Sequence, residues 1–220
     1  MPHPADHTDH ADHVGLGPVL AALTAPDGEF PLVAATVDGV PMRVHAREPH
    51  TLRELSLTTP VPGDRVATVY GHERCTYAEH RRLVTGLAAW LRDEHRLRPG
   101  DRVAIAMRNV PEWSVAFWAA MVAGLVAVPL NAWWTGDQLA GAIGHAEARV
   151  VVADPERVAA LTGREDLPPV VRVRGEGPAP PGVVAWEDVV RPSADTPPAV
   201  DVTPDAIATL IYTSGTTGRP

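Results

Sequence analysis

The sequence predicts an α/β fold in which a layered sheet is flanked by helices. The apolar run at residues 102–107 is too short for a helix and apolar enough for a central strand. A helix with apolar residues at i, i+3 and i+4 spacing precedes this run, from Thr76 to about residue 98. The same order recurs with a helix at residues 135–147 and a strand at 149–154. Alternation of helix and strand is the pattern of an α/β sheet.

The composition is that of a water-soluble globular protein. The chain has 220 residues, of which 45% are hydrophobic and 21% charged, so it is long enough to bury a substantial core. Its 27 acidic residues outnumber 19 basic ones, which argues against a nucleic-acid-binding surface. Every basic residue is arginine, so this segment cannot use lysine in catalysis. The single cysteine, Cys75, excludes an internal disulfide and suits a reducing cytosol, and we expect a cytoplasmic protein.

Residues 1–14 are expected to form a disordered tail rich in histidine and aspartate. They lack apolar periodicity, and they also lack the basic start and apolar core of a signal peptide. A metal-binding tract is the alternative interpretation, carried by His3, His7, His10, His13, Asp6, Asp9 and Asp12. With no cysteine to close a zinc site, we predict no metal site.

Residues 15–60 are predicted to be an N-terminal extension. Its expected elements are a short amphipathic helix at 14–23, strands at 32–37 and 40–44 joined by Asp38-Gly39, and a short helix to residue 57 opened by the capping box of Thr51 and Glu54.

Residues 61–220 are predicted to form one domain. Besides the elements above, we expect strands at 65–70, 75–77, 126–128, 170–173 and 183–186. We also expect a second capping box at Thr76 and Glu79, a helix opened by Asn109 and Pro111, a helix capped by Thr135, and a short helix ending at residue 161.

Residues 113–130 carry no charge, but Gly124 and Pro129 interrupt them, so a buried helix is favoured over a membrane span. Trp133 and Trp134 are expected to cover the core, with contact to an acyl chain as the alternative.

The end of the chain carries the strongest functional pattern. A predicted buried strand at residues 206–212 leads directly into hydroxyl residues interleaved with two glycines. Glycines let a backbone approach a ligand closely, and successive N–H groups and hydroxyls can then hold an anion. The spacing differs from that of a Walker A loop, since only two residues separate the glycines. The predicted phosphate-binding residues are Thr213, Ser214, Gly215, Thr216, Thr217 and Gly218, with Tyr212 and Pro220 shaping the loop.

The order of residues 212–220, Tyr-Thr-Ser-Gly-Thr-Thr-Gly-Arg-Pro, resembles the phosphate-binding signature of the AMP-forming adenylating enzymes. This superfamily includes acyl-CoA synthetases, luciferases and the adenylation domains of peptide synthetases. Further landmarks appear in the family's order over about residues 60–220. They are Thr-Tyr-Ala-Glu at 76–79, Pro-Gly-Asp-Arg-Val-Ala at 99–104, Asn-Val-Pro-Glu at 109–112, Ala-Gly at 123–124 and Val-Pro-Leu-Asn at 128–131. The resemblance implies the N-terminal subdomain of the adenylate-forming fold, closest in character to bacterial long-chain fatty-acyl-CoA synthetases.

The resemblance also implies an activity. The family uses Mg-ATP to convert a carboxylic acid to an acyl-adenylate, which a thiol such as coenzyme A then intercepts. In the family a Lys-Gly pair follows the signature, whereas this chain stops one residue before that lysine, so we expect a truncated piece without catalytic residues that neither adenylates nor binds ATP tightly alone. The alternatives are an aryl-CoA ligase, an amino-acid adenylation domain, or a non-catalytic pseudo-enzyme fragment.

Overall fold

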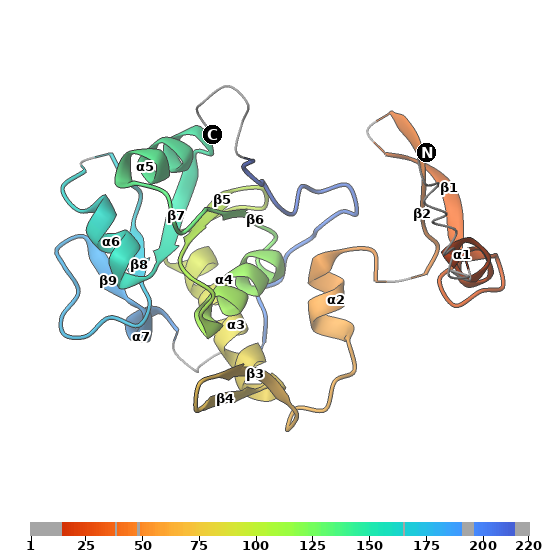
Figure 1. The fold of residues 1–220 in the computed structure, drawn as a ribbon, viewed down its shortest axis with the longest axis horizontal. Helices are drawn as coiled ribbons and strands as arrows, with labels where there is room; N and C mark the ends of the chain where they lie inside the picture. The colour runs from red at the N-terminus through yellow and green to blue at the C-terminus, as the bar shows by residue number, and fades with distance from the viewer. Residues whose placement is uncertain (1–14, 38, 48, 165, 191–195, 214–220) are drawn as a thin grey trace, which may run out of the picture. The chain divides into compact units, whose positions relative to one another are not determined.

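The computed structural model describes residues 15–37, 39–47, 49–164, 166–190 and 196–213 (Figure 1). Contacts between residues divide the chain into two compact units, Met1–His50 and Thr51–Pro220. None of the helices in these described segments is long and apolar enough to cross a membrane. The finer division into a tail, an extension and a domain beginning at residue 61 stays a prediction.

The first unit contains a helix and a β-hairpin. Its elements are α1 (Leu16–Thr24), β1 (Leu32–Val37) and β2 (Val40–His45). The two strands pair antiparallel, with Val37 opposite Val40, which is the register of the predicted two-residue turn. Gly39 in this turn has a φ of 79°, a conformation that glycine adopts without steric cost. The hairpin prediction is therefore confirmed.

The second unit contains every strand and helix predicted between residues 65 and 186. Its elements are α2 (Leu52–Thr58), β3 (Val66–Tyr70), β4 (Glu73–Thr76), α3 (Tyr77–Asp93), β5 (Arg102–Ala106), α4 (Pro111–Val122), β6 (Val126–Pro129), α5 (Gly136–His145), β7 (Ala148–Ala153), α6 (Pro155–Leu161), β8 (Val170–Arg172), β9 (Val183–Ala185) and α7 (Trp186–Val189). The uncharged run at 113–130 is thus divided between α4 and β6. The interpretation as a buried helix followed by a strand is confirmed.

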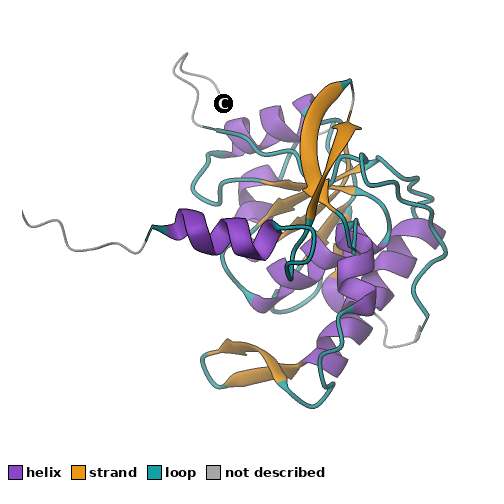
Figure 2. Cartoon of the chain, turned by 90° about the vertical axis from the view of Figure 1, so that its right-hand side faces the viewer, coloured by secondary structure: helices purple, strands orange, loops and turns teal. Residues whose placement is uncertain are grey.

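A five-stranded parallel sheet organises this unit. Its strand order is β6-β5-β7-β8-β9, and every neighbouring pair is parallel. In chain order this is the doubly wound arrangement 2-1-3-4-5, whose topological switch point lies between β5 and β7. The predicted α/β class is confirmed. The β3–β4 hairpin forms a separate two-stranded sheet, seen at the lower end of the molecule in Figure 2.

Helices cover both faces of the parallel sheet. Buried side chains of α3, α4 and α7 form one core cluster, and those of α5 and α6 form a second cluster (Figure 1). The central strand supplies both clusters alternately: Val103 and Ile105 face the first, whereas Ala104 and Ala106 face the second. Because a strand buried on both faces needs apolar side chains on both, its sequence is apolar without alternation.

Capping boxes mark where three of the described helices begin. The boxes predicted at Thr51 and Thr76 are both complete, and Thr135 makes a third box with Gln138. The start of α4 was predicted wrongly: its N-cap is Val110, which makes no side-chain cap bond, so Asn109 is not the cap. Pro111 occupies the first turn of this helix. The fixed φ of proline favours that position without a side-chain cap.

Helix α3 is shorter than the predicted span to residue 98. It ends at Asp93, and Arg96 follows with a φ of 52°. The backbone N–H of Leu97 donates to the carbonyl of Leu91 at 3.1 Å, which satisfies a carbonyl at the end of the helix. The chain reverses at a left-handed arginine, a position where the sequence offers no glycine or proline.

Two glycines of α5 are expected to differ in their tolerance of a methyl group. A Cβ on Gly136 would lie 2.1 Å from the carbonyl oxygen of Ala160, whereas one on Gly141 meets nothing within 4 Å. We expect Gly136→Ala to lower the free energy of unfolding by about 1–3 kcal/mol. Gly141→Ala should raise it by about 0.5–1 kcal/mol, because alanine loses less backbone entropy on folding. Urea denaturation measures both, and equal effects at the two positions would contradict the close packing at Gly136.

Candidate functional site

The predicted phosphate-binding residues lie at the edge of the described chain. Of the six, Thr213 is described and its side chain is exposed. The other five, Ser214, Gly215, Thr216, Thr217 and Gly218, lie outside the described residues, as does Pro220. The part of the site that the structure places is therefore residues 206–212, which lead into the loop and are called the stem below.

The stem is not the buried strand that the apolar run at residues 206–212 predicts. It forms one parallel bridge, Thr209 with Ala127 of β6, in which the Ala127 N–H donates to the Ala208 carbonyl and the Leu210 N–H donates to the Ala127 carbonyl, both at 3.0 Å. Ile207 and Ile211 are both 71% exposed. Among the described residues, β6 is the one β-strand with which the stem pairs. Apolar residues alone do not reveal how many neighbours a strand has.

Tyr212 fastens the end of the stem to helix α5. Its hydroxyl oxygen lies 2.7 Å from Nδ1 of His145 and donates to the carbonyl of Ala142 at 3.2 Å. Its ring meets that of Trp134 edge to face, with centroids 6.0 Å apart. Partial burial raises the pKa of the Tyr212 phenol, so the neutral, hydrogen-bond-donating form is favoured. Tyr212 thus makes three described contacts with α5 and the residue before its cap, and its shape-setting role stays a prediction.

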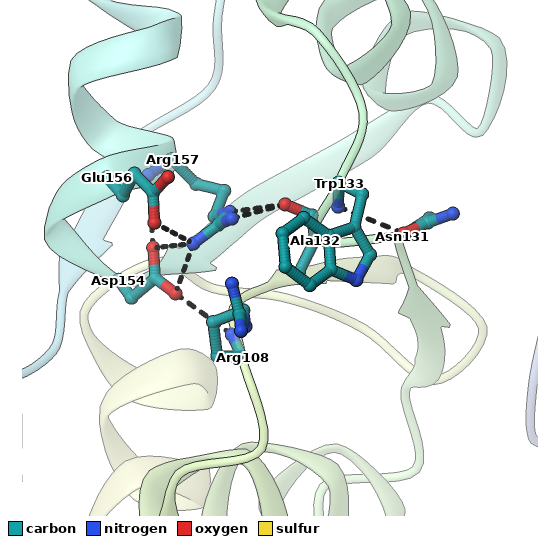
Figure 3. Close-up of polar contacts among 7 residues, drawn as sticks. All are labelled: Arg108, Asn131, Ala132, Trp133, Asp154, Glu156 and Arg157. Carbon is teal, nitrogen blue, oxygen red and sulfur yellow. Dashed lines mark hydrogen bonds and ion pairs between the residues drawn. The ribbon is translucent and has the colours of Figure 1, made fainter.

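A buried ion pair between Asp154 and Arg157 lies at the switch point of the sheet, between β5 and β7. The carboxylate of Asp154, directly after β7, accepts from the backbone N–H of Arg108, two residues after the end of β5, at 2.9 Å (Figure 3). It also accepts from the backbone N–H of Arg157 at 3.0 Å and pairs with the Arg157 guanidinium at 3.0 Å. The side chains of Asp154 and Arg157 are only 8% and 5% exposed. One carboxylate therefore joins the ends of two central strands and caps α6.

The same guanidinium reaches the loop after β6. Nε of Arg157 donates to the carbonyl of Ala132 at 2.7 Å, and its Nη2 also contacts that oxygen (Figure 3). Glu156 adds an ion pair at 2.9 Å, although its carboxylate is mostly exposed. Three strand ends are thus tied together at the carboxyl edge, where open α/β sheets bind their ligands.

A hollow of about 530 Å³, within the usual size range of ligand pockets, is lined in part by Arg108 and Ala132, whose backbones contact this ion pair. Tyr70, Trp113 and Asn131 line it, together with Arg108 and Trp133. The guanidinium carbon of Arg108 lies 4.0 Å from the centre of the Trp133 ring, a cation–π contact. An aromatic face beside a guanidinium can hold a planar group or an anion.

The paired tryptophans have different environments. Trp134 is half-buried and packs against the α5–α6 cluster, so its predicted place over the core is confirmed. The same prediction for Trp133 is wrong, because that side chain is 75% exposed. Its indole ring stacks on Arg108, a partner that comes from a different strand end and is not visible in the local sequence.

Arg174 joins the β3–β4 hairpin to the sheet. Its guanidinium contacts Glu73 of β4 at 2.7 Å and Glu112 of α4 at 2.6 Å, and it lies over the ring of Tyr70. The hydrogen bond from Arg174 lowers the pKa of the Glu73 carboxyl, and the same contact raises the pKa of Arg174. Arg174 has a φ of 51°, a left-handed conformation rare for arginine, which these three contacts help to hold.

Sequence reasoning missed Arg108, His145, Asp154, Arg157 and Arg174. Only Asp154 carried a local signal, since an aspartate followed by proline after a strand is a typical helix start. The partners of the other four lie far away in the sequence. In the described part of the chain, no three His, Cys, Asp or Glu side chains gather to hold a metal ion. The histidine-rich residues 1–14 lie outside that part.

The comparison with protein families places most of this chain in one family. The family described as AMP-binding enzyme matches residues 58–220, which include the stem and the predicted phosphate-binding residues. A solved structure, that of the anthranilate CoA ligase AuaEII in complex with anthranoyl-AMP, has a TM-score of 0.70 at 23% identity. The match covers 77% of this chain and 33% of the ligase chain, and it supports the fold.

Two curated relatives show the range of proteins that are similar in sequence. The 3-hydroxybenzoate–CoA/4-hydroxybenzoate–CoA ligase of Thauera aromatica is 31% identical over 161 residues, covering 72% of this chain and 31% of the ligase. A medium/long-chain-fatty-acid–CoA ligase of Mycobacterium tuberculosis (strain ATCC 25618 / H37Rv) is 32% identical over 163 residues, covering 72% and 26%. The chain therefore spans about a third or less of the length of these relatives.

Proposed function

This chain belongs to the family of AMP-binding enzymes, and we propose that the whole protein activates a carboxylic acid with ATP and transfers the acyl group to coenzyme A. The observation that carries the proposal is the run of hydroxyl residues and glycines at 213–218, which lies inside the segment that matches the family. Its stem is fastened by Tyr212 to α5. The proposal further places the protein in the cytoplasm.

The chemistry proceeds in two transfers. A carboxylate oxygen of the acid bonds to the α-phosphorus of ATP while the bond to the bridging oxygen of pyrophosphate breaks, so pyrophosphate leaves with the electron pair. The sulfur of coenzyme A then bonds to the acyl carbon, AMP leaves, and the thiol proton is released. Both steps place negative charge on a departing phosphate group.

The proposed role of the loop is electrostatic. Prealigned N–H and hydroxyl donors stabilise charge that develops on phosphate oxygens, without forming covalent bonds. We assign this role to Thr213, Ser214, Gly215, Thr216, Thr217 and Gly218 for the β- and γ-phosphates. Mg²⁺ would accompany ATP and neutralise part of its charge. Since no described cluster of side chains suits a metal, we assign Mg²⁺ to no residue of this chain.

The proposed acid is a fatty acid, with an aromatic acid or an amino acid as the alternatives. The similarity to ligases named for hydroxybenzoate and for fatty acids supports acid activation without favouring either class. The hollow beside Trp133 and Arg108 is lined by aromatic side chains and is one place where such an acid could bind. That these 220 residues alone are inactive remains a prediction.

A pyrophosphate-exchange assay on the full-length protein tests the proposal. With labelled pyrophosphate, ATP and a panel of acids, we expect acid-dependent exchange that is greatest with fatty acids, because the adenylation step is reversible. Exchange confined to benzoates or amino acids would replace the fatty-acid assignment while leaving acid activation intact. No exchange with any acid, from protein shown to be folded, would favour the non-catalytic alternative.

A further inference from the structure

We propose that His145 is a positioning residue for ATP binding, which acts by holding Tyr212 at the base of the phosphate-binding loop. The proposal rests on the proposed function, since it assigns the loop to ATP phosphates. His145 lies in the last turn of α5, 67 residues before Tyr212, and neither residue was connected to the other by the sequence pattern.

The hydrogen-bond directions at Tyr212 are determined by its single hydroxyl proton. That proton is donated to the carbonyl oxygen of Ala142, which lies at 3.2 Å. The hydroxyl oxygen must then accept from His145, so Nδ1 of His145 carries a proton and donates across the 2.7 Å contact. His145 is therefore a donor that the tyrosine needs, and a side chain without a donor at this position cannot replace it.

The helix that supplies this donor is a firm support. The capping box of Thr135 and Gln138 closes the N-terminus of α5, and Leu139, Ala142 and Ile143 are buried in the second core cluster. The carbonyl of Ala142 also accepts from the N–H of Ala146 at 2.9 Å. Tyr212 thus binds at the C-terminal end of a packed helix, as a second donor to a carbonyl that already accepts a hydrogen bond within the helix.

The stem has few other restraints close to the loop. Its described backbone pairing is centred on Thr209, three residues before Tyr212, and the intervening Ile211 is 71% exposed. The contacts of Tyr212 with His145, Ala142 and Trp134 are therefore the described restraints nearest to Thr213. Because Tyr212 is already held by these contacts, less conformational entropy is lost at this end of the stem when ATP binds.

The test compares the affinities of the full-length protein for ATP and adenosine by isothermal titration calorimetry. His145→Ala should raise the Kd for ATP about fivefold, the factor that one hydrogen bond of ordinary net strength represents. The Kd for adenosine should not change, because adenosine has no phosphates. His145→Asn should restore most of the ATP affinity, since its amide can place a donor near the position of Nδ1.

Tyr212→Phe and a control separate this mechanism from a general loss of structure. Tyr212→Phe removes the acceptor, so His145→Ala should have no further effect on ATP binding in that background. His72→Ala, which removes an exposed imidazole from the β3–β4 turn, should leave both affinities unchanged. An equal loss of ATP and adenosine binding, or an unchanged Kd for ATP, in His145→Ala would overturn the positioning role alone. Failure of the unsubstituted protein to bind ATP would overturn the proposed function and this inference together.

Discussion

Replacing Asp154 by alanine is expected to lower the free energy of unfolding by about 3–5 kcal/mol, because the change leaves the buried guanidinium of Arg157 without its carboxylate. The guanidinium is 5% exposed, and its described acidic contacts are Asp154 and the carboxylate of Glu156, which is 75% exposed. The substitution also removes the described acceptor of the Arg108 backbone N–H, whereas the Arg157 N–H keeps the backbone carbonyl of Asp154 at 3.1 Å. Each buried donor that loses its partner adds to the cost.

Chemical denaturation of the variant measures this loss, and Asp137→Ala is the matched control. Asp137 also pairs with an arginine, Arg164, at 2.6 Å, but its side chain is 89% exposed. Its loss should cost no more than about 1 kcal/mol, because water and salt screen an exposed pair. Equal effects for the two aspartates would show that burial of the Asp154 pair does not determine its contribution.

A second substitution identifies the source of the cost. In Asp154→Ala combined with Arg157→Met, no unpaired charge remains buried, so part of the lost stability should return. The backbone N–H of Arg108 would still lack its carboxylate acceptor, so recovery should be incomplete. If the double variant is less stable than Asp154→Ala, the unpaired guanidinium is not the main cause of the loss.

The features that the sequence predicts well are those whose physical cause is local. The capping boxes at Thr51 and Thr76 require only residues three apart, and both are present. The central strand at Arg102–Ala106 is apparent because burial on two faces leaves a continuous apolar run. Alternating helices and strands predict an α/β sheet but not the order of its strands. The position of the switch point is known only from the structure.

The features that the sequence did not predict depend on residues that are distant in the chain. The Asp154 carboxylate meets Arg108 across 46 positions, and Tyr212 meets His145 across 67. No periodicity or spacing rule connects such pairs. The apolar residues at 206–212 were interpreted as a buried strand, but with Ile207 and Ile211 exposed they belong to a segment with a single described β-neighbour. The number of neighbours is a property of the sheet rather than of the strand.

Removing the two hydroxyl groups on either side of Gly215 is expected to lower kcat/KM for ATP about 100-fold or more in the full-length protein. In the proposed function, Ser214 and Thr216 donate to phosphate oxygens whose charge increases as pyrophosphate leaves. Loss of one such prealigned donor commonly lowers the rate by about 10²–10³-fold. The variant Ser214→Ala with Thr216→Ala leaves Gly215 and Gly218 unchanged, so the backbone freedom of the loop is kept.

Rates of acid-dependent pyrophosphate release, measured against ATP and against the acid, separate this role from others. The KM for the acid should stay within about twofold, because the hydroxyls are assigned to phosphate rather than to the acyl group. Thr58→Ala is the control: it removes an exposed hydroxyl that donates to the carbonyl of Glu54 at the end of α2, and it should not alter the rates. If the double variant keeps its kcat/KM for ATP, the hydroxyls of Ser214 and Thr216 do not stabilise the phosphate charge. That charge would then be stabilised by the backbone of the loop or by groups outside it.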